Sequence, residues 1–282
     1  MKVYVAPCGL GLGHVGRCVP LFKKLKEKDK NTKVLFSTYA EGAEYVEKAG
    51  FPLVKAPAVG VKVKPDGTID FKQTVVKPGP FVACFMIVKQ IVAELENIQR
   101  FSPDVVVSDS RASTIIAAKL LGIPTVCILN QFQVIIPRKR RFLRLSKLAD
   151  AILLAVVGKI WTSVDYLLIP DFPQPYTISE GNLRIPRAYQ KRVQLVGPII
   201  PVQPEELPKK EALREKLGLD VEKPLIFASI SGPLKERAYL LSVLKKMFLH
   251  FPKKYQVVMS MGYPGSTAAP VKRGNFTLYR WI

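Results

Sequence analysis

The sequence predicts an α/β protein with two Rossmann-like domains, the second of them incomplete. Three observations support this. Short apolar runs alternate with segments of helical periodicity, which is typical of a parallel sheet wrapped by helices. The proline-rich stretch 198–208 has little apolar periodicity and is typical of a linker. A second strand and helix series then begins, but holds only about three strands of the usual five or six. We therefore expect a first domain over 1–197, a linker over 198–208 and a partial second domain over 209–282.

The first domain opens with a strand at Lys2–Pro7, a glycine-rich loop at Gly9–Gly13 and a helix that starts at Val15. The apolar residues of this helix share one stripe, and lysines fill the other side. After a hairpin-like excursion within 57–80, the alternation resumes. The other predicted elements are strand Val34–Ser37, helix Glu41–Lys48, strand Leu53–Lys55, helix Phe81–Arg100, strand Asp104–Ser108, helix Ser113–Leu121, strand Pro124–Leu129, helix Arg138–Lys159, strand Tyr166–Ile169 and strand Arg192–Val196.

The second domain repeats the strand–loop–helix arrangement. Its predicted elements are helix Lys209–Leu217, strand Pro224–Ile230, loop Ser231–Pro233, helix Lys235–Phe248, strand Tyr255–Ser260 and a final strand that starts at Phe276. A sheet that ends there would expose Phe276–Ile282 as an unpaired apolar edge, which favours association. We therefore expect that the chain is a fragment, or that the missing strands come from another chain.

The composition restricts the partners. Lys and Arg number 43 against 22 Asp and Glu, a net charge of +21, which favours phosphorylated ligands, anionic lipid or nucleic acid. Nucleic acid ranks lower, because no basic and aromatic stacking platform is present. Two histidines are too few for a His-rich metal site. The cysteines form no C-x-x-C pair and are expected to be free thiols in a reducing compartment: Cys8, Cys18, Cys84 and Cys127.

The amino-terminus lacks the pattern of a signal peptide. The longest apolar stretch, Ala151–Ile169, is interrupted by Lys159 and Asp165, and two charges inside a bilayer would be costly. We expect a cytoplasmic protein without a transmembrane helix.

The loop between the first strand and helix is the first candidate site. Its glycines permit a close approach to a ligand, and the start of the helix suits an anion. Gly11-x-Gly13-x-x-Gly16 also matches the dinucleotide fingerprint, which expects an acidic residue about 20 positions later. The second strand ends instead in Phe36-Ser37-Thr38, without an acid. The alternative is a tight strand-to-helix turn without a ligand.

His14 lies at the mouth of this loop and is a candidate general base, because an imidazole titrates near neutrality. The alternative is a histidine that caps or orients the helix. Asp109, the second candidate catalytic residue, and Ser110 follow one apolar strand, and Asn130 and Gln131 follow the next. Ligands of parallel sheets bind beyond the carboxyl ends of the strands, so these side chains are predicted to share a rim with the loop. Each could instead cap a helix.

Two further candidates are less specific. Ser231-Gly232-Pro233 lies between a strand and a helix and is a candidate diphosphate contact. Arg138–Lys159 reads as a basic amphipathic helix, whose Arg140, Arg141 and Arg144 are candidates for contact with anionic lipid. The alternative is a solvated surface helix packed on its own domain.

The glycine-rich turn that ends in Gly13-His14, the Rossmann-like domain, the proline-rich joint and the second unit together resemble GT-B glycosyltransferases. The resemblance is greatest to the MurG-like branch, especially its archaeal members. It implies a nucleotide-sugar donor such as UDP-N-acetylglucosamine, an acceptor that is often lipid-linked, and no bound metal. From the basic helix we also expect peripheral contact with the inner membrane face. It places Gly11, Gly13 and Asn130 on the acceptor side, and Ser231 and Gly232 at the donor.

The same resemblance implies that the main donor-binding segment follows Ile282, so we expect this chain alone to lack full activity. Rival hypotheses stay open: a nucleotide-sugar epimerase of the same fold, a non-catalytic subunit that binds membrane or a partner, and, more distantly, a dinucleotide oxidoreductase. An epimerase would turn over donor without acceptor. A binding subunit would show no turnover, and its attachment to anionic vesicles would weaken when the arginines are reversed.

Overall fold

The computed structural model describes residues 1–58, 79–130, 155–183, 185–230, 234–263 and 266–282. They form two compact units that divide between Pro201 and Val202. This division falls inside the 198–208 stretch, while the roles assigned to the two domains stay predictions. Within the described ranges, no helix has both the length and the hydropathy needed to cross a bilayer.

The first unit is built on a parallel seven-stranded sheet with the order β3-β2-β1-β4-β5-β6-β7. The strands are β1 (Lys2–Pro7), β2 (Lys33–Thr38), β3 (Leu53–Lys55), β4 (Val105–Asp109), β5 (Thr125–Ile128), β6 (Tyr166–Ile169) and β7 (Val193–Leu195). The strand order reverses between β1 and β4, so the loops that follow these two strands diverge. Ligands of open α/β sheets bind at such a switch point.

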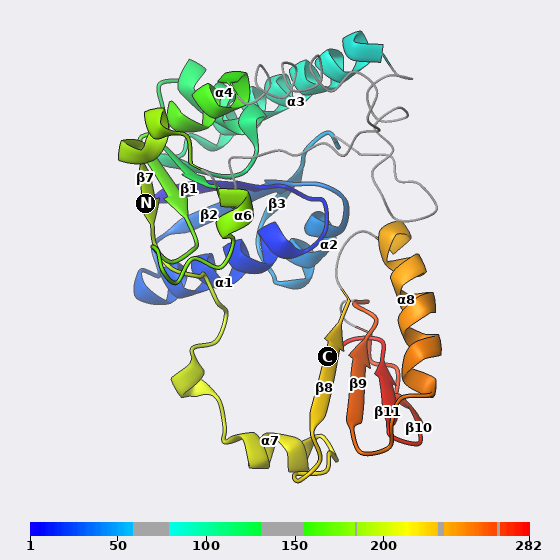
Figure 1. The fold of residues 1–282 in the computed structure, drawn as a ribbon. Helices are drawn as coiled ribbons and strands as arrows, with labels where there is room; N and C mark the ends of the chain where they lie inside the picture. The colour runs from blue at the N-terminus through cyan, green and yellow to red at the C-terminus, as the bar shows by residue number, and fades with distance from the viewer. Residues whose placement is uncertain (59–78, 131–154, 184, 231–233, 264–265) are drawn as a thin grey trace. The chain divides into compact units, whose positions relative to one another are not determined.

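Helices cover both faces of this sheet (Figure 1). The helices are α1 (Gly13–Lys28), α2 (Ala40–Lys48), α3 (Gly79–Phe101), α4 (Ala112–Leu120) and α6 (Glu180–Leu183), with a 3₁₀ helix, η2, at Arg187–Arg192. Residues 155–162 are also helical; the rest of the predicted Arg138–Lys159 helix falls mostly in 131–154, outside the described residues. The predicted hairpin within 57–80 also lies mostly outside them.

The core follows from the alternation of side chains along β1. Val3 and Val5 face α1 and α2 and pack with Cys18 and Phe22, whereas Tyr4 faces α3 and α4. Successive residues of a strand point to opposite faces, so a strand covered on both sides is apolar throughout. The predicted stripe on α1 is confirmed, since its apolar residues pack into this core.

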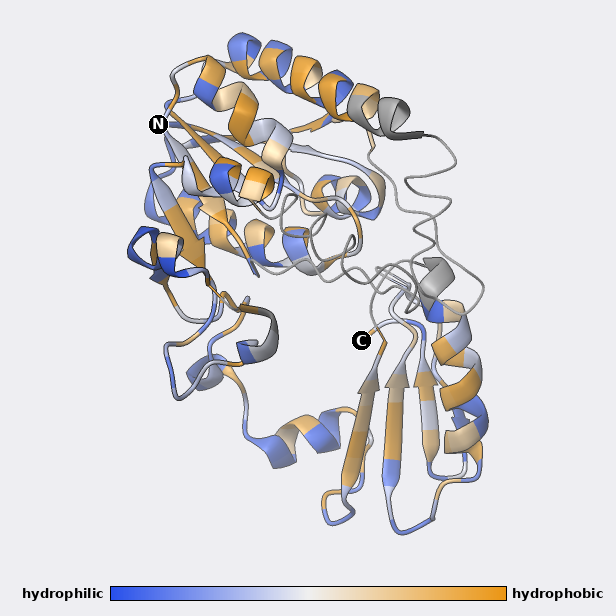
Figure 2. Ribbon diagram, turned by 45° about the horizontal axis from the view of Figure 1, so that its top comes forward, coloured by the Kyte–Doolittle hydropathy of each residue, from blue (hydrophilic) through white to orange (hydrophobic). Residues whose placement is uncertain are grey.

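The second unit contains a four-stranded sheet with the order β10-β11-β9-β8, largely hydrophobic along its strands (Figure 2). Its elements are η3 (Pro204–Glu206), α7 (Lys210–Lys216), β8 (Leu225–Ser229), α8 (Leu234–Leu249), β9 (Gln256–Ser260), β10 (Val271–Arg273) and β11 (Phe276–Tyr279). α8 packs Leu241 and Phe248 against Val257, Met259 and Phe276 of the sheet.

One expectation for this sheet is wrong. Phe276–Ile282 is not an unpaired apolar edge: the strand ends at Tyr279, and β11 lies between β9 and β10. β10 pairs antiparallel with β11 and is fully exposed, with the sequence Val-Lys-Arg. A short, charged outer strand protects the apolar strand beside it from intermolecular pairing.

Candidate active site

The loop Gly9–Leu12 carries the chain from β1 into α1. Gly11 has a φ of +70°, a conformation that glycine adopts at little cost. α1 then begins at Gly13, and its N-cap residue, Leu12, provides no side-chain hydrogen bond. The first N–H groups of a helix have no acceptor within the helix, and the helix dipole adds partial positive charge there. The loop is therefore suited to an anion or to a developing negative charge.

Close packing fixes the first glycine of the loop. A Cβ at Gly9 would lie 2.0 Å from the carbonyl oxygen of Tyr39, and the Gly9 carbonyl accepts the N–H of Gly42 at 3.2 Å. By contrast, a Cβ at Gly13 or Gly16 would meet no atom within 4 Å. In a dinucleotide site the last glycine permits close packing of helix and strand. Gly16 has no such role here, which argues against the dinucleotide hypothesis.

His14 and Asp109 form a hydrogen-bonded pair at the switch point. Nδ1 of His14 lies 2.7 Å from Oδ1 of Asp109. The sheet brings the two residues together, because Pro7 and Asp109 are paired at the ends of β1 and β4. The Cys8 N–H also donates to the Asp109 carbonyl at 3.1 Å. Both predicted catalytic residues therefore belong to one site.

Arg17 is the residue that the sequence analysis missed. It lies one turn after His14 on α1 and donates Nε–H to Oδ2 of Asp109 at 2.6 Å and an Nη–H to Oδ1 at 2.5 Å. Its other Nη group donates to Oδ1 of the exposed Asn130. Arg17 thus joins the Asp109 carboxylate to the side chain that follows β5. Its i, i+3 spacing from His14 is the signal that indicates this contact in the sequence.

The Asp109 carboxylate is buried and ionised. Its side chain has no exposed surface. Burial acts to raise the pKa, but the hydrogen bonds and charges of His14 and Arg17 outweigh it and hold the pKa below the usual value. The Cys18 thiol, 3.5 Å from Oδ2, has a raised pKa because of burial and the nearby carboxylate, so it remains a neutral donor.

This charge state determines the tautomer of His14. An ionised carboxylate only accepts hydrogen bonds, so Nδ1 of His14 carries the proton and donates a hydrogen bond to Asp109. Nε2 then holds the free lone pair. The imidazole is partly exposed, at 22% of its side-chain surface, so a ligand in the loop can reach it. The arrangement can accept a proton from a hydroxyl group.

Ser110, which follows Asp109, has a positive φ of 64°. Its N–H donates to the Ile128 carbonyl at 3.0 Å, and its hydroxyl lies 3.3 Å from Oδ1 of Asp109. Strained backbone of this kind persists where the surroundings fix it, often at functional sites. The strain here orients the end of β4.

A second buried ion pair supports the rim from below. Arg111 donates to Oε1 of Glu94 at 2.5 Å, and the hydroxyls of Tyr4 and Ser37 donate to the same carboxylate at 2.9 and 2.6 Å. The Arg111 N–H is also 3.2 Å from the Ser108 hydroxyl. These contacts connect β1, β2, α3 and the start of α4 beneath the site. A buried ion pair of this kind fixes geometry rather than adding net stability.

The other predicted site residues divide into two groups. Gly11 lies in the loop, Gly13 is the first residue of α1, and Asn130 lies at the rim. The remainder fall outside the described residues: Gln131, Arg140, Arg141, Arg144, Ser231 and Gly232. Of the cysteines whose side chains are described, Cys8, Cys18 and Cys127 are free thiols. The described part of the chain has no cluster of three His, Cys, Asp or Glu residues suited to a metal ion.

Solved structures share this fold over most of the chain. One is CalG4, the calicheamicin glycosyltransferase, with a TM-score of 0.55 and 17% identity, covering 100% of this chain and 71% of that one. Another is the spinosyn rhamnosyltransferase SpnG complexed with thymidine diphosphate, with a TM-score of 0.54 and 15% identity, covering 92% of this chain and 65% of that one. The chain therefore has the GT-B fold that these glycosyltransferases share.

The chain is also related in sequence to an uncharacterized glycosyltransferase of Methanosarcina mazei, with 29% identity over 240 residues. That match covers 82% of this chain and 57% of the relative, so the chain spans little more than half of the protein that it resembles. No family model matches the chain.

Proposed function

We propose that this chain carries the acceptor side of a glycosyltransferase, which transfers a sugar from a nucleotide-sugar to a hydroxyl group. The observation that carries the proposal is the hydrogen bond between His14 and the buried Asp109 at the switch point of the sheet. The relationship to glycosyltransferases by sequence and by fold supports it.

In the proposed reaction, Nε2 of His14 accepts the proton of the acceptor hydroxyl as its oxygen attacks the anomeric carbon of the donor. The bond from that carbon to the nucleoside diphosphate breaks, and the diphosphate leaves with the electron pair. Asp109 holds the tautomer and stabilises the imidazolium. It orients His14 and does not touch the substrate. The N–H groups at the start of α1 favour nearby negative charge.

The identity of the substrates is the finer part of the proposal. Thymidine diphosphate in the SpnG complex supports a nucleoside diphosphate donor. A UDP-sugar such as UDP-N-acetylglucosamine, and a lipid-linked or glycan acceptor at the inner membrane face, are proposed from the resemblance to MurG-like enzymes. We also propose that the reaction requires no metal ion.

The test measures release of nucleoside diphosphate from UDP- and TDP-sugars, with and without hydroxyl acceptors. We expect acceptor-dependent release that His14→Ala lowers at least 100-fold. His250→Ala is the matched control, because His250 is the other histidine of the chain and lies in the second unit. Equal rates for His14→Ala and the wild type would contradict the proposed role of His14.

Two other outcomes would indicate the rival functions. Donor turnover without acceptor, through inversion at a sugar carbon, would indicate an epimerase. No turnover with any donor, together with attachment to anionic vesicles, would indicate a binding subunit.

A further inference from the structure

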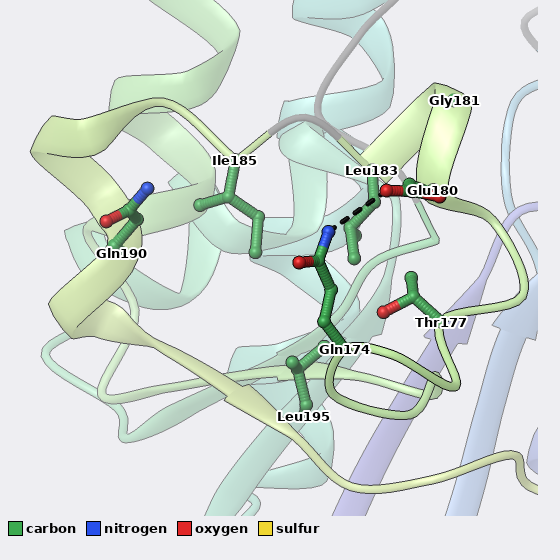
Figure 3. A pocket seen from close by; sticks show the side chains of 8 residues that line it. All are labelled: Gln174, Thr177, Glu180, Gly181, Leu183, Ile185, Gln190 and Leu195. Carbon is green, nitrogen blue, oxygen red and sulfur yellow. Dashed lines mark hydrogen bonds between the residues drawn. The ribbon is translucent and has the colours of Figure 1, made fainter.

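A pocket of about 730 Å³ lies at the far side of the first sheet, away from β1. We call it the edge pocket, because it is framed by the crossover from β6 to β7 and by Leu195 at the end of the edge strand β7. Figure 3 shows the side chains of Gln174, Leu183 and Ile185 converging on it from three directions. No part of the proposed reaction uses it.

The lining of the edge pocket combines two kinds of group. Leu183, Ile185 and Leu195 provide an aliphatic wall, and the polar groups come from Gln174, Thr177, Glu180 and Gln190. Amides and hydroxyls both donate and accept hydrogen bonds, and a carboxylate accepts. A sugar ring presents the same combination, with hydroxyl groups around its rim and C–H groups on its faces.

The charge of the pocket differs from that of the whole chain. The chain has a net charge of +21, yet the described residues that line the pocket include no Lys or Arg, and the charged one is Glu180. Among these described residues, a phosphate or an acidic sugar would meet the Glu180 carboxylate. The lining therefore favours a neutral, hydroxyl-rich ligand.

The wall that carries Gln174 and Thr177 is held in place by one carboxylate. Asp171, which is buried, accepts the N–H groups of Phe172, Ile178 and Ser179 at 2.7, 2.9 and 2.9 Å, and the Ser179 hydroxyl at 2.5 Å. Across the pocket mouth, Gln174 donates to Oε1 of Glu180 at 3.0 Å. A site whose polar groups are already oriented loses little conformational entropy on binding.

The position of the pocket relates it to the candidate active site. Gln174 and Leu195 lie at or beyond the carboxyl ends of β6 and β7, and His14 follows the carboxyl end of β1. Four strand spacings separate β1 from β7, which is about 19 Å. A ligand that reaches both places has to be longer than one sugar ring.

We infer that the edge pocket binds a neutral sugar unit of an extended glycan acceptor, whose reacting hydroxyl lies at His14. The role of this ligand as an acceptor rests on the proposed function, whereas binding of the sugar to the pocket does not depend on it. The pocket then selects acceptors by a unit distant from the bond that is formed.

Gly181 provides a direct test. It lines the pocket, and a Cβ there would meet no atom within 4 Å, so the backbone can carry a side chain at this position and Gly181→Trp introduces bulk at the pocket. Gln174→Ala is the second variant, since it removes one polar group from an exposed position. Gln194→Ala is the matched control, because Gln194 is also exposed and points to the opposite face of β7 from Leu195.

The measurement is calorimetric titration of the whole chain, without donor, with triacetylchitotriose, maltotriose and mannotriose, and with inorganic pyrophosphate as the anionic comparison. We expect at least one neutral trisaccharide to bind, with affinity lowered tenfold or more by Gly181→Trp, about threefold or more by Gln174→Ala and less than twofold by Gln194→Ala. Pyrophosphate binding should not depend on Gly181.

Three results would overturn the inference: no binding of any trisaccharide, binding unaffected by both pocket variants, or pyrophosphate binding that Gly181→Trp abolishes. Melting curves identify a variant that fails to fold. The trisaccharide affinity of the other pocket variant then tests the inference. Gly181-dependent trisaccharide binding without sugar transfer would overturn the proposed function and the acceptor role, but not the sugar site. Sugar transfer without trisaccharide binding would overturn the pocket inference alone.

Discussion

Arg17 donates its Nε–H to Oδ2 of Asp109 at 2.6 Å, while Nδ1 of His14 is hydrogen-bonded to Oδ1 of the same carboxylate. Asp109 thus has two basic partners from consecutive turns of α1. His14 and Arg17 together hold the pKa of the buried carboxylate below its usual value, and the carboxylate in turn fixes the histidine tautomer. The predictions below test this dependence and the scaffold around it.

Replacing Asp109 with Asn removes the charge but keeps the size of the side chain. The amide can hold His14 in the wrong tautomer, so we expect kcat for sugar transfer to fall about 10²- to 10⁴-fold with little change in KM. Steady-state kinetics of the variant measure this. Asp165→Asn is the control, because Asp165 lies at the amino end of β6 and is half-exposed. A kcat within threefold of wild type would show that Asp109 does not orient the base.

Replacing Arg17 with Ala leaves the buried carboxylate with fewer donors. Hydrogen bonds to charged groups contribute about 1.5–3 kcal/mol, so we expect kcat/KM to fall about 10- to 100-fold. Arg17→Lys should recover part of this loss, because it restores the charge but not the paired N–H groups. If Lys and Ala have the same effect, the charge of Arg17 is not what supports Asp109.

The two glycines at positions 9 and 16 should respond in opposite directions to alanine. Gly9→Ala places a Cβ against the Tyr39 carbonyl, so we expect the free energy of unfolding to fall by about 3 kcal/mol or more. Gly16→Ala lies within α1 in open space and should raise it by about 0.5–1 kcal/mol. Urea denaturation of both variants provides the measurement, and equal midpoints would contradict the close approach at Gly9.

Asp171 should make the stability of the first unit depend on acid pH. Burial acts to raise its pKa, but the donors from Phe172, Ile178 and Ser179 lower it to about 2. An unfolded aspartate titrates near 3.9, so the contribution is fully present above about pH 5 and is lost as the pH falls toward 2. We expect Asp171→Asn to cost about 2 kcal/mol at pH 7 and progressively less below pH 4. Urea midpoints between pH 2.5 and 7 measure this, and a pH-independent difference would count against the assignment.

Most of the scaffold could be predicted because its signals are local. β1, β3 and β6 have the predicted bounds, and α2 begins one residue earlier than expected. The alternation of apolar runs and helical stripes therefore identified the fold class. β10 was missed because Val271–Arg273 is three residues long, fully exposed and without alternation, so the sequence contains no pattern that distinguishes it from a loop.

The candidate site was predicted in part for the same reason. Strand ends and a glycine loop are visible in the sequence, and they indicated His14, Asp109 and Asn130. Which side chains pair across the sheet depends on its register, and the sequence does not give it. The Glu94–Arg111 ion pair illustrates this: in the sequence Glu94 is one of several charged residues of α3, and its burial depends on the packing of α3 against the sheet and α4.

The backbone contact between Gly9 and Gly42 ties the glycine turn to α2. Any displacement of the turn has to carry α2 with it, since the Gly42 amide is bonded to the Gly9 carbonyl and no side chain separates the two segments. The turn is therefore a fixed part of the first unit and not a mobile loop. Hydrogen exchange at the Gly42 amide, which donates to the turn, should therefore be as slow in the free protein as in a liganded one.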